Sequence, residues 1–131
     1  MNKVRVLLAD DHQAILARVR RELGEEFEVI GTAANGAEAV DAVSQLDPDV
    51  LVIDISMPGL SGLEAAERLH TSCRRTKIVF LTIHDDPDFI AAALSAGASG
   101  YVTKNRLSDD LVPAIREALL GHTFVSETLN K

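Results

Sequence analysis

Short apolar runs alternate along this chain with segments in which apolar residues recur every three or four positions. The short runs are typical of buried strands, whereas the longer periodic segments are typical of helices that bury one face. The alternation occurs five times. The predicted strands are Val4–Ala9, Glu28–Ala33, Val50–Asp54, Lys77–Thr82 and Ser99–Thr103.

The predicted helices carry start and stop signals. Asn35 with Glu38 three residues later, and Ser61 with Glu64, are typical capping pairs at helix N-termini. Pro113 interrupts the last helical pattern, so it either kinks the first turn or moves the start of the helix. The predicted helices run from about His12 to Leu23, from after Asn35 to before Asp47, from Ser61 onward, through Phe89 to a stop at Gly97, and from after Ser108 to Gly121.

Five strand–helix units in this order predict an α/β fold, a doubly wound parallel sheet of five strands with helices on both faces. Residues 1–121 would form one domain, a size that is sufficient for a single core. Residues 122–131 show no clear period. We expect them to be a tail or the start of a linker.

Composition narrows the class of protein. The 131 residues are 47% hydrophobic and only 4% aromatic, which predicts an aliphatic core. A net charge of −7 argues against direct nucleic-acid binding by this segment. No apolar run approaches a membrane span, and the N-terminus lacks the features of a signal peptide. The single cysteine excludes an internal disulfide. We therefore expect a cytoplasmic, soluble protein.

Polar side chains follow four of the predicted strands. Asp54 ends the apolar run that begins at Val50, just before a Pro-Gly turn, and is the most informative of them. Asp10 and Asp11 follow the first strand. Thr82 ends the fourth strand, and Lys104 follows the fifth. Because the carboxyl ends of parallel strands meet at one edge of the sheet, we expect these side chains to converge.

Three converging carboxylates would repel one another unless a cation compensates. Mg²⁺ prefers oxygen ligands and is usually held by one or two carboxylates together with phosphate oxygens. Asp54 beside such an ion could attack a phosphoryl group and form an acyl phosphate. Lys104 and Thr82 would then share the charge of the transferred group. The residues thus predict a magnesium-assisted phosphoryl acceptor.

Each residue also has a plainer interpretation. An aspartate at a strand end is more often a turn former or a helix cap, and this applies to Asp11 in particular. Thr82 is typical of strands in general, and Lys104 could be a solvated loop residue. Taken singly, each plain interpretation is favoured. All four residues at the ends of four strands favour a site instead.

The chain resembles the receiver domain of bacterial two-component response regulators over residues 3–121. The matching segments are Ala-Asp-Asp-His at 9–12, Asp-Ile-Ser-Met-Pro-Gly-Leu-Ser-Gly at 54–62, Leu-Thr-Ile-His-Asp-Asp at 81–86 and Gly-Ala-Ser-Gly-Tyr-Val-Thr-Lys at 97–104. The residues of the last two segments are similar to those of the NarL/FixJ subfamily. The resemblance implies a flavodoxin-like (βα)5 receiver fold and a signalling module, not an enzyme.

The resemblance also implies roles for individual residues. Asp54 would accept a phosphoryl group from the phosphohistidine of a sensor histidine kinase. Asp11 would bind Mg²⁺ directly and Asp10 through water, and Asp54 and the backbone carbonyl of Ser56 would complete the protein ligands. Lys104 would bind the phosphoryl oxygens of the product.

Thr82 would share that role and act as a switch with Tyr101, which would turn inward when Thr82 moves toward the phosphate. Without the resemblance, Tyr101 is a half-buried strand aromatic with its hydroxyl in water. Asn105 follows Lys104 where many receivers have a proline in a cis peptide, so the geometry of that peptide stays open. Implied partners are a C-terminal helix-turn-helix DNA-binding domain and a second copy in a phosphorylation-dependent homodimer.

Two other functions would use some of the same residues. A phosphatase-like enzyme with an aspartyl-phosphate intermediate needs, in its haloacid-dehalogenase-like form, a second carboxylate two residues after the nucleophile, and here that residue is Ser56. A receiver-like interaction domain that no longer takes phosphate would not need Asp11, Asp54, Thr82 and Lys104 together. Both are therefore less favoured than the receiver.

Overall fold

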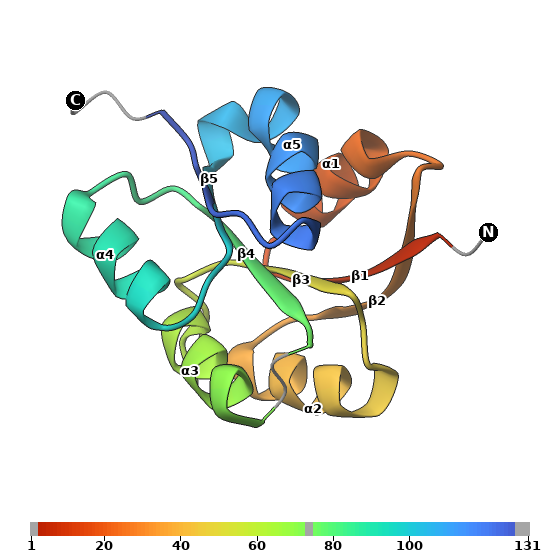
Figure 1. Ribbon diagram of the computed structural model, residues 1–131. Helices are drawn as coiled ribbons and strands as arrows, with labels where there is room; N and C mark the ends of the chain where they lie inside the picture. Colours follow the sequence, from red (N-terminus) through yellow and green to blue (C-terminus); the bar gives the residue numbers. More distant parts are fainter. Residues whose placement is uncertain (1–2, 73–74, 128–131) are drawn as a thin grey trace.

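The computed structural model describes residues 3–72 and 75–127 and contains a six-stranded, wholly parallel sheet (Figure 1). The strand order is β2-β1-β3-β4-β5-β6. The strands are β1 (Val4–Ala9), β2 (Phe27–Ala33), β3 (Val50–Ile53), β4 (Lys77–Thr82), β5 (Gly100–Thr103) and β6 (Phe124–Val125). The helices are α1 (Gln13–Leu23), α2 (Gly36–Leu46), α3 (Gly62–Ser72), α4 (Pro87–Ser95) and α5 (Leu107–Leu119), and a 3₁₀ turn, η1 (Lys104–Arg106), precedes α5.

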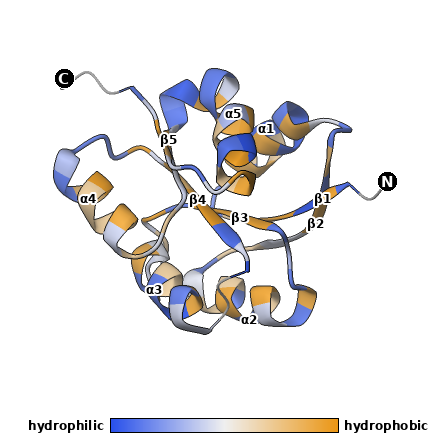
Figure 2. Cartoon of the chain, in the orientation of Figure 1, coloured by the Kyte–Doolittle hydropathy of each residue, from blue (hydrophilic) through white to orange (hydrophobic). Residues whose placement is uncertain are grey.

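Helices cover both faces of the sheet, with α1 and α5 on one face and α2, α3 and α4 on the other (Figure 1). Successive strand side chains point to opposite faces, so Leu7 packs with the α2–α4 core while Leu8 packs with the α1–α5 core. Strands buried on both faces need near-continuous apolar sequence, and all four residues of β3 are buried. Figure 2 shows hydrophobic residues along the central strands and the inner sides of the helices. The predicted fold class is confirmed.

The sheet has one strand more than the five predicted. Phe124 and Val125 form β6, which pairs in parallel with Gly100 and Tyr101 of β5. A strand of two residues is too short to show a period in the sequence, which is why the pattern gave no sign of it. The segment that leaves α5 therefore returns to the sheet edge.

The predicted helix caps are present. The Asn35 side chain accepts a hydrogen bond from the Glu38 backbone N–H at 2.9 Å, and the Ser61 hydroxyl accepts one from the Glu64 N–H at 3.2 Å. The last helix begins at Leu107, earlier than predicted, because η1 runs directly into it. This earlier start leaves Pro113 inside the helix, on its exposed side.

Two backbone features shape the edge of the sheet where β3 and β5 end. The peptide between Lys104 and Asn105 is trans, as are all peptide bonds among residues 3–72 and 75–127. Gly62, at the start of α3, donates its N–H to the carbonyl of Ile55 at 2.8 Å. A Cβ at Gly62 would overlap the carbonyl oxygen of Asp54. Glycine therefore allows the start of α3 to lie directly against the backbone of Asp54 and Ile55.

Candidate functional site

Asp10 and Asp54 lie side by side at the ends of two neighbouring strands. Ala9 is paired with Ile53 in the β1–β3 register, and the Asp54 N–H donates to the Ala9 carbonyl at 3.0 Å. Each aspartate is only 4% exposed. Burial of two neighbouring carboxylates is unfavourable unless cations or hydrogen bonds compensate, so the fold must supply such partners here.

Lys104 supplies the compensating positive charge. Its Nζ lies 3.0 Å from Asp10 Oδ2 and 3.1 Å from Asp54 Oδ2, and its side chain is 11% exposed. Burial lowers the pKa of this ammonium, but hydrogen bonds and ion pairs with Asp10 and Asp54 outweigh it, so the Lys104 pKa is raised above its usual value. Lys104 therefore bridges the two buried carboxylates in its charged form.

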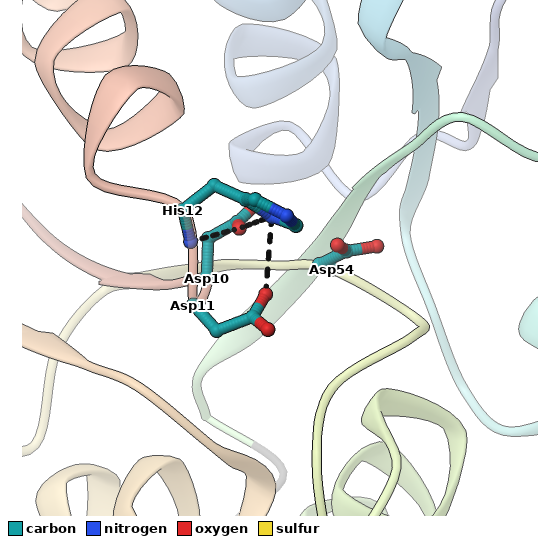
Figure 3. A group of neighbouring side chains, drawn as sticks. All are labelled: Asp10, Asp11, His12 and Asp54. Carbon is teal, nitrogen blue, oxygen red and sulfur yellow. Dashed lines mark hydrogen bonds and ion pairs between the residues drawn. The ribbon is translucent and has the colours of Figure 1, made fainter.

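Asp11 and His12 follow Asp10 at the end of β1 and lie near Asp54 (Figure 3). The imidazole Nδ1 of His12 lies 3.1 Å from an oxygen of Asp10 and 3.1 Å from an oxygen of Asp11. The His12 backbone N–H also donates to Asp10 Oδ1 at 2.9 Å. The sequence prediction did not include His12 in the site. The signal was present in the uninterrupted Asp-Asp-His run at a strand end.

The ligand atoms of this group fit a hard divalent cation. One ligand atom each from Asp10, Asp11, His12 and Asp54 lies within 4.8 Å of all the others. The group has three carboxylates, and the ammonium of Lys104 contacts two of them, Asp10 and Asp54. The excess of negative charge that remains would be balanced by one divalent ion. Mg²⁺ prefers oxygen ligands and keeps several bound waters. The exposed position of Asp11 would leave room for those waters.

A cavity of about 410 Å³ opens beside Asp54. The backbone N–H of Ser56 donates to Asp54 Oδ1 at 3.2 Å, so Ser56 lies against the carboxylate, although a ligand role for its carbonyl remains a prediction. The cavity is large enough for a phosphoryl group to approach. Its lining residues are His12, Ile15, Asp54, Ser56, Ile83, His84 and Lys104.

Thr82 and Tyr101 both contact the backbone of His84. The Thr82 hydroxyl accepts a hydrogen bond from the His84 N–H at 3.3 Å, and the Tyr101 hydroxyl donates to the His84 carbonyl at 2.6 Å. Both residues are fully buried. The interpretation of Tyr101 as a half-buried aromatic with its hydroxyl in water is therefore wrong, because the ring points inward and its hydroxyl is bonded to protein.

The side chain of His84 adds two contacts that the sequence did not indicate. Its Nε2 lies 2.8 Å from the Ser56 hydroxyl, and its ring stacks on Phe89 of α4 with centroids 4.2 Å apart. Ser56 is two residues from Asp54 in the chain. His84 thus connects the loop after β3 with α4.

Tyr101 is the only tyrosine of the chain, so its ionisation can be followed directly. Burial, and then the negative charges of Asp85, Asp86 and Asp54, raise its pKa to about 12. We expect the absorbance of tyrosinate to appear only near that pH in the folded protein, and near pH 10 after denaturation. The stabilisation from the neutral phenol is complete below about pH 10 and is lost as the pH rises through 12. A folded-state titration at the unfolded value would contradict the buried position.

A doubly wound parallel sheet that brings buried aspartates and a lysine together at the ends of three strands has the architecture of a signalling receiver. Residues 6–116 match the response regulator receiver domain, and the chain belongs to this family. Within it, the similarities support the NarL/FixJ subfamily.

The oxygen regulatory protein NreC of Staphylococcus epidermidis is 39% identical over 129 residues, which cover 96% of this chain and 59% of NreC. The structure of a LuxR-family two-component response regulator from Aurantimonas sp. matches with a TM-score of 0.88 and 33% identity, over 94% of this chain and 89% of that one. The isolated receiver domain of RcsB from Salmonella enterica serovar Typhimurium, in the presence of the phosphomimetic BeF3−, matches with a TM-score of 0.87 and 28% identity, over 96% and 95%.

The chain thus spans about three fifths of the length of NreC. Among the described residues, no helix has the length and apolar character that a membrane crossing requires.

Proposed function

We propose that Asp54 is the phosphoacceptor of this receiver domain and that its phosphorylation switches the conformation of the domain. The single observation that carries the proposal is the contact of the Lys104 ammonium with both Asp54 and Asp10, beside a cavity that reaches Asp54. A buried carboxylate held by a cation and open to a phosphoryl donor is arranged for group transfer.

In the proposed reaction, a carboxylate oxygen of Asp54 attacks phosphorus and forms a P–O bond. With a phosphohistidine donor the P–N bond breaks and its electron pair stays on the imidazole, whereas with acetyl phosphate a P–O bond breaks and acetate leaves. Asp10, Asp11 and Asp54, with the carbonyl of Ser56, would hold Mg²⁺. The ion would neutralise charge on the phosphoryl oxygens.

The residues around Asp54 would then detect the product. A phosphoryl group adds nearly two negative charges, which the Lys104 ammonium and the Thr82 hydroxyl would bind. In the structure the Thr82 hydroxyl accepts a hydrogen bond from the His84 N–H, and the Tyr101 hydroxyl donates one to the His84 carbonyl. Movement of Thr82 would therefore shift the backbone of His84 and change its hydrogen bond with Tyr101. Thr82 and Tyr101 are therefore the proposed switch pair.

The partners follow from the family and remain proposals for this chain. A sensor histidine kinase would supply the phosphoryl group, and a DNA-binding output domain would follow the receiver in the full-length protein. NreC extends well beyond the matched segment, which leaves length for such a domain. We also propose a homodimer that forms on phosphorylation. The domain itself would be a signalling module that catalyses at most its own phosphorylation and dephosphorylation.

Intact mass spectrometry tests the proposal. We expect acetyl phosphate with Mg²⁺ to add one phosphoryl group to the chain, and chelation of the metal by EDTA to reduce the labelled fraction to background. Peptide mapping should place the group on Asp54. Labelling that proceeds equally in EDTA would contradict the metal site. Multiple turnover of a small phosphoester without accumulation of labelled protein would favour the phosphatase-like enzyme instead.

A further inference from the structure

A third buried carboxylate, Asp110 in α5, has hydrogen-bond partners other than those of Asp10 and Asp54. Its side chain is only 10% exposed. Arg106 makes two contacts with it, Nε to Oδ2 at 3.1 Å and a terminal guanidinium nitrogen to Oδ1 at 3.1 Å. The Ser126 hydroxyl donates a third hydrogen bond, to Asp110 Oδ2, at 2.7 Å. Arg106 and Ser126 thus both compensate the buried charge of Asp110.

Ser126 belongs to the segment that follows β6 and is itself buried, at 3% exposure. Its N–H donates to the carbonyl of Tyr101 at 2.8 Å, and its hydroxyl accepts the N–H of Thr103 at 3.3 Å. Ser126 therefore joins the end of β5 to α5. We call Arg106, Asp110 and Ser126 the C-terminal clasp.

The clasp is connected to the proposed phosphoacceptor site through the 3₁₀ turn η1. Arg106 is the last residue of η1, which begins with Lys104, and the Leu107 N–H donates to the Lys104 carbonyl. Asp110 holds Arg106 in two-point contact, so it fixes the turn from which the Lys104 ammonium reaches Asp54. Thr103, which donates to Ser126, directly precedes Lys104.

The energetics make the clasp sensitive to the loss of either partner. Burial raises the pKa of Asp110, but the hydrogen bonds from Arg106 and Ser126 outweigh it, so the pKa is held below its usual value. A buried charge that loses a partner is strongly destabilising, whereas a complete set fixes one geometry. The segment held in this way is the last described part of the chain.

We propose that Asp110 is a positioning residue for Lys104, and that Ser126 couples the segment leaving the receiver to the phosphoacceptor site. The inference rests on the proposed function, since it assigns Lys104 a part in binding the phosphoryl group. Coupling between two sites is reciprocal, so occupation of the Asp54 site should tighten the hold on Ser126 to the same extent that the clasp favours occupation.

The test is the affinity of the 131-residue chain for beryllofluoride with Mg²⁺, compared between wild type, Ser126→Ala and Asp110→Asn. We expect both variants to bind about fivefold more weakly or worse. Asp109→Asn is the matched control, because Asp109 is the neighbouring carboxylate on α5 but is 71% exposed and lies 3.6 Å from Arg106. It should bind as wild type does. The double variant should bind no more weakly than Asp110→Asn alone, because both changes interrupt one network.

A second measurement separates positioning from general destabilisation. Hydrogen exchange at the Thr103 amide reports directly on its bond to Ser126, and in wild type we expect it to slow when beryllofluoride is added. In Ser126→Ala this slowing should be lost while the far-ultraviolet circular dichroism stays unchanged.

The outcomes distinguish the two proposals. Beryllofluoride that binds wild type and both clasp variants equally would overturn the clasp while leaving Asp54 as the phosphoacceptor. Beryllofluoride that fails to bind wild type would overturn the proposed function and the clasp together.

Discussion

Asp54→Asn is expected to reduce labelling of the chain by acetyl phosphate to background. The amide has the shape of the carboxylate but lacks a nucleophilic anionic oxygen, so no P–O bond can form at this position. The fold should survive the change. Removal of one of two neighbouring buried carboxylates relieves their repulsion, and Lys104 keeps Asp10 as its partner at 3.0 Å. Intact mass after incubation with Mg²⁺ and acetyl phosphate measures the labelled fraction.

Asp41→Asn is a suitable control for that experiment, because Asp41 is an exposed aspartate on α2 and is not one of the clustered side chains. It should be labelled as wild type is. Labelling of Asp54→Asn to the wild-type level would show that a different side chain accepts the phosphoryl group. Since the three clustered aspartates are close together, peptide mapping must accompany the mass measurement.

The convergence of the site could be predicted because it follows from sheet topology. β1, β3 and β4 are consecutive in the sheet and parallel. The residues directly after these strands therefore lie at the same edge of the sheet, whatever the conformations of their side chains. Asp54 was the clearest signal, because a charge directly after four buried apolar residues has few structural reasons to be there. The contacts of Lys104 with Asp10 and Asp54 agree with the convergence that the strand ends predicted.

Side-chain contacts within that edge could not be predicted in the same way. The position of the His12 ring between Asp10 and Asp11 depends on a rotamer at the start of α1, and periodicity carries no information about it. The stacking of His84 on Phe89 depends on how the loop between β4 and α4 closes.

The C-terminal clasp was missed for a different reason. β6 has only two residues, and the bond between Ser126 and Asp110 joins positions 16 residues apart with no shared motif. Hydrophobic periodicity reveals features that repeat along the sequence, whereas the hydrogen bond between Ser126 and Asp110 is a single long-range contact. Residues 122–131 show no clear period and were therefore predicted to be a tail or the start of a linker, although Phe124–Val125 pairs with β5.

Lys104→Ala is expected to slow phosphorylation of Asp54 by about 100-fold or more while Mg²⁺ binding is retained. Loss of one preorganised cationic donor to the reacting oxygens has an effect of that order in other group transfers. Metal binding should persist because Asp10, Asp11 and Asp54 remain, and removal of the ammonium only makes their surroundings more negative. Rates of labelling by acetyl phosphate and calorimetric titration with Mg²⁺ measure the two properties separately.

The same variant tests the charge balance of the site. Without Lys104, two buried carboxylates lose their shared partner, so the metal-free protein should be less stable by about 3–5 kcal/mol, and Mg²⁺ should recover much of that loss. Lys77→Ala, at the opposite end of β4, should show neither effect. The raised pKa of Lys104 keeps its stabilising contribution constant below about pH 10, and this contribution is lost only as the pH rises through the folded-state pKa. If Lys104→Ala abolished Mg²⁺ binding, the ammonium would have to organise the metal ligands, and its proposed role toward the phosphoryl group alone would be wrong.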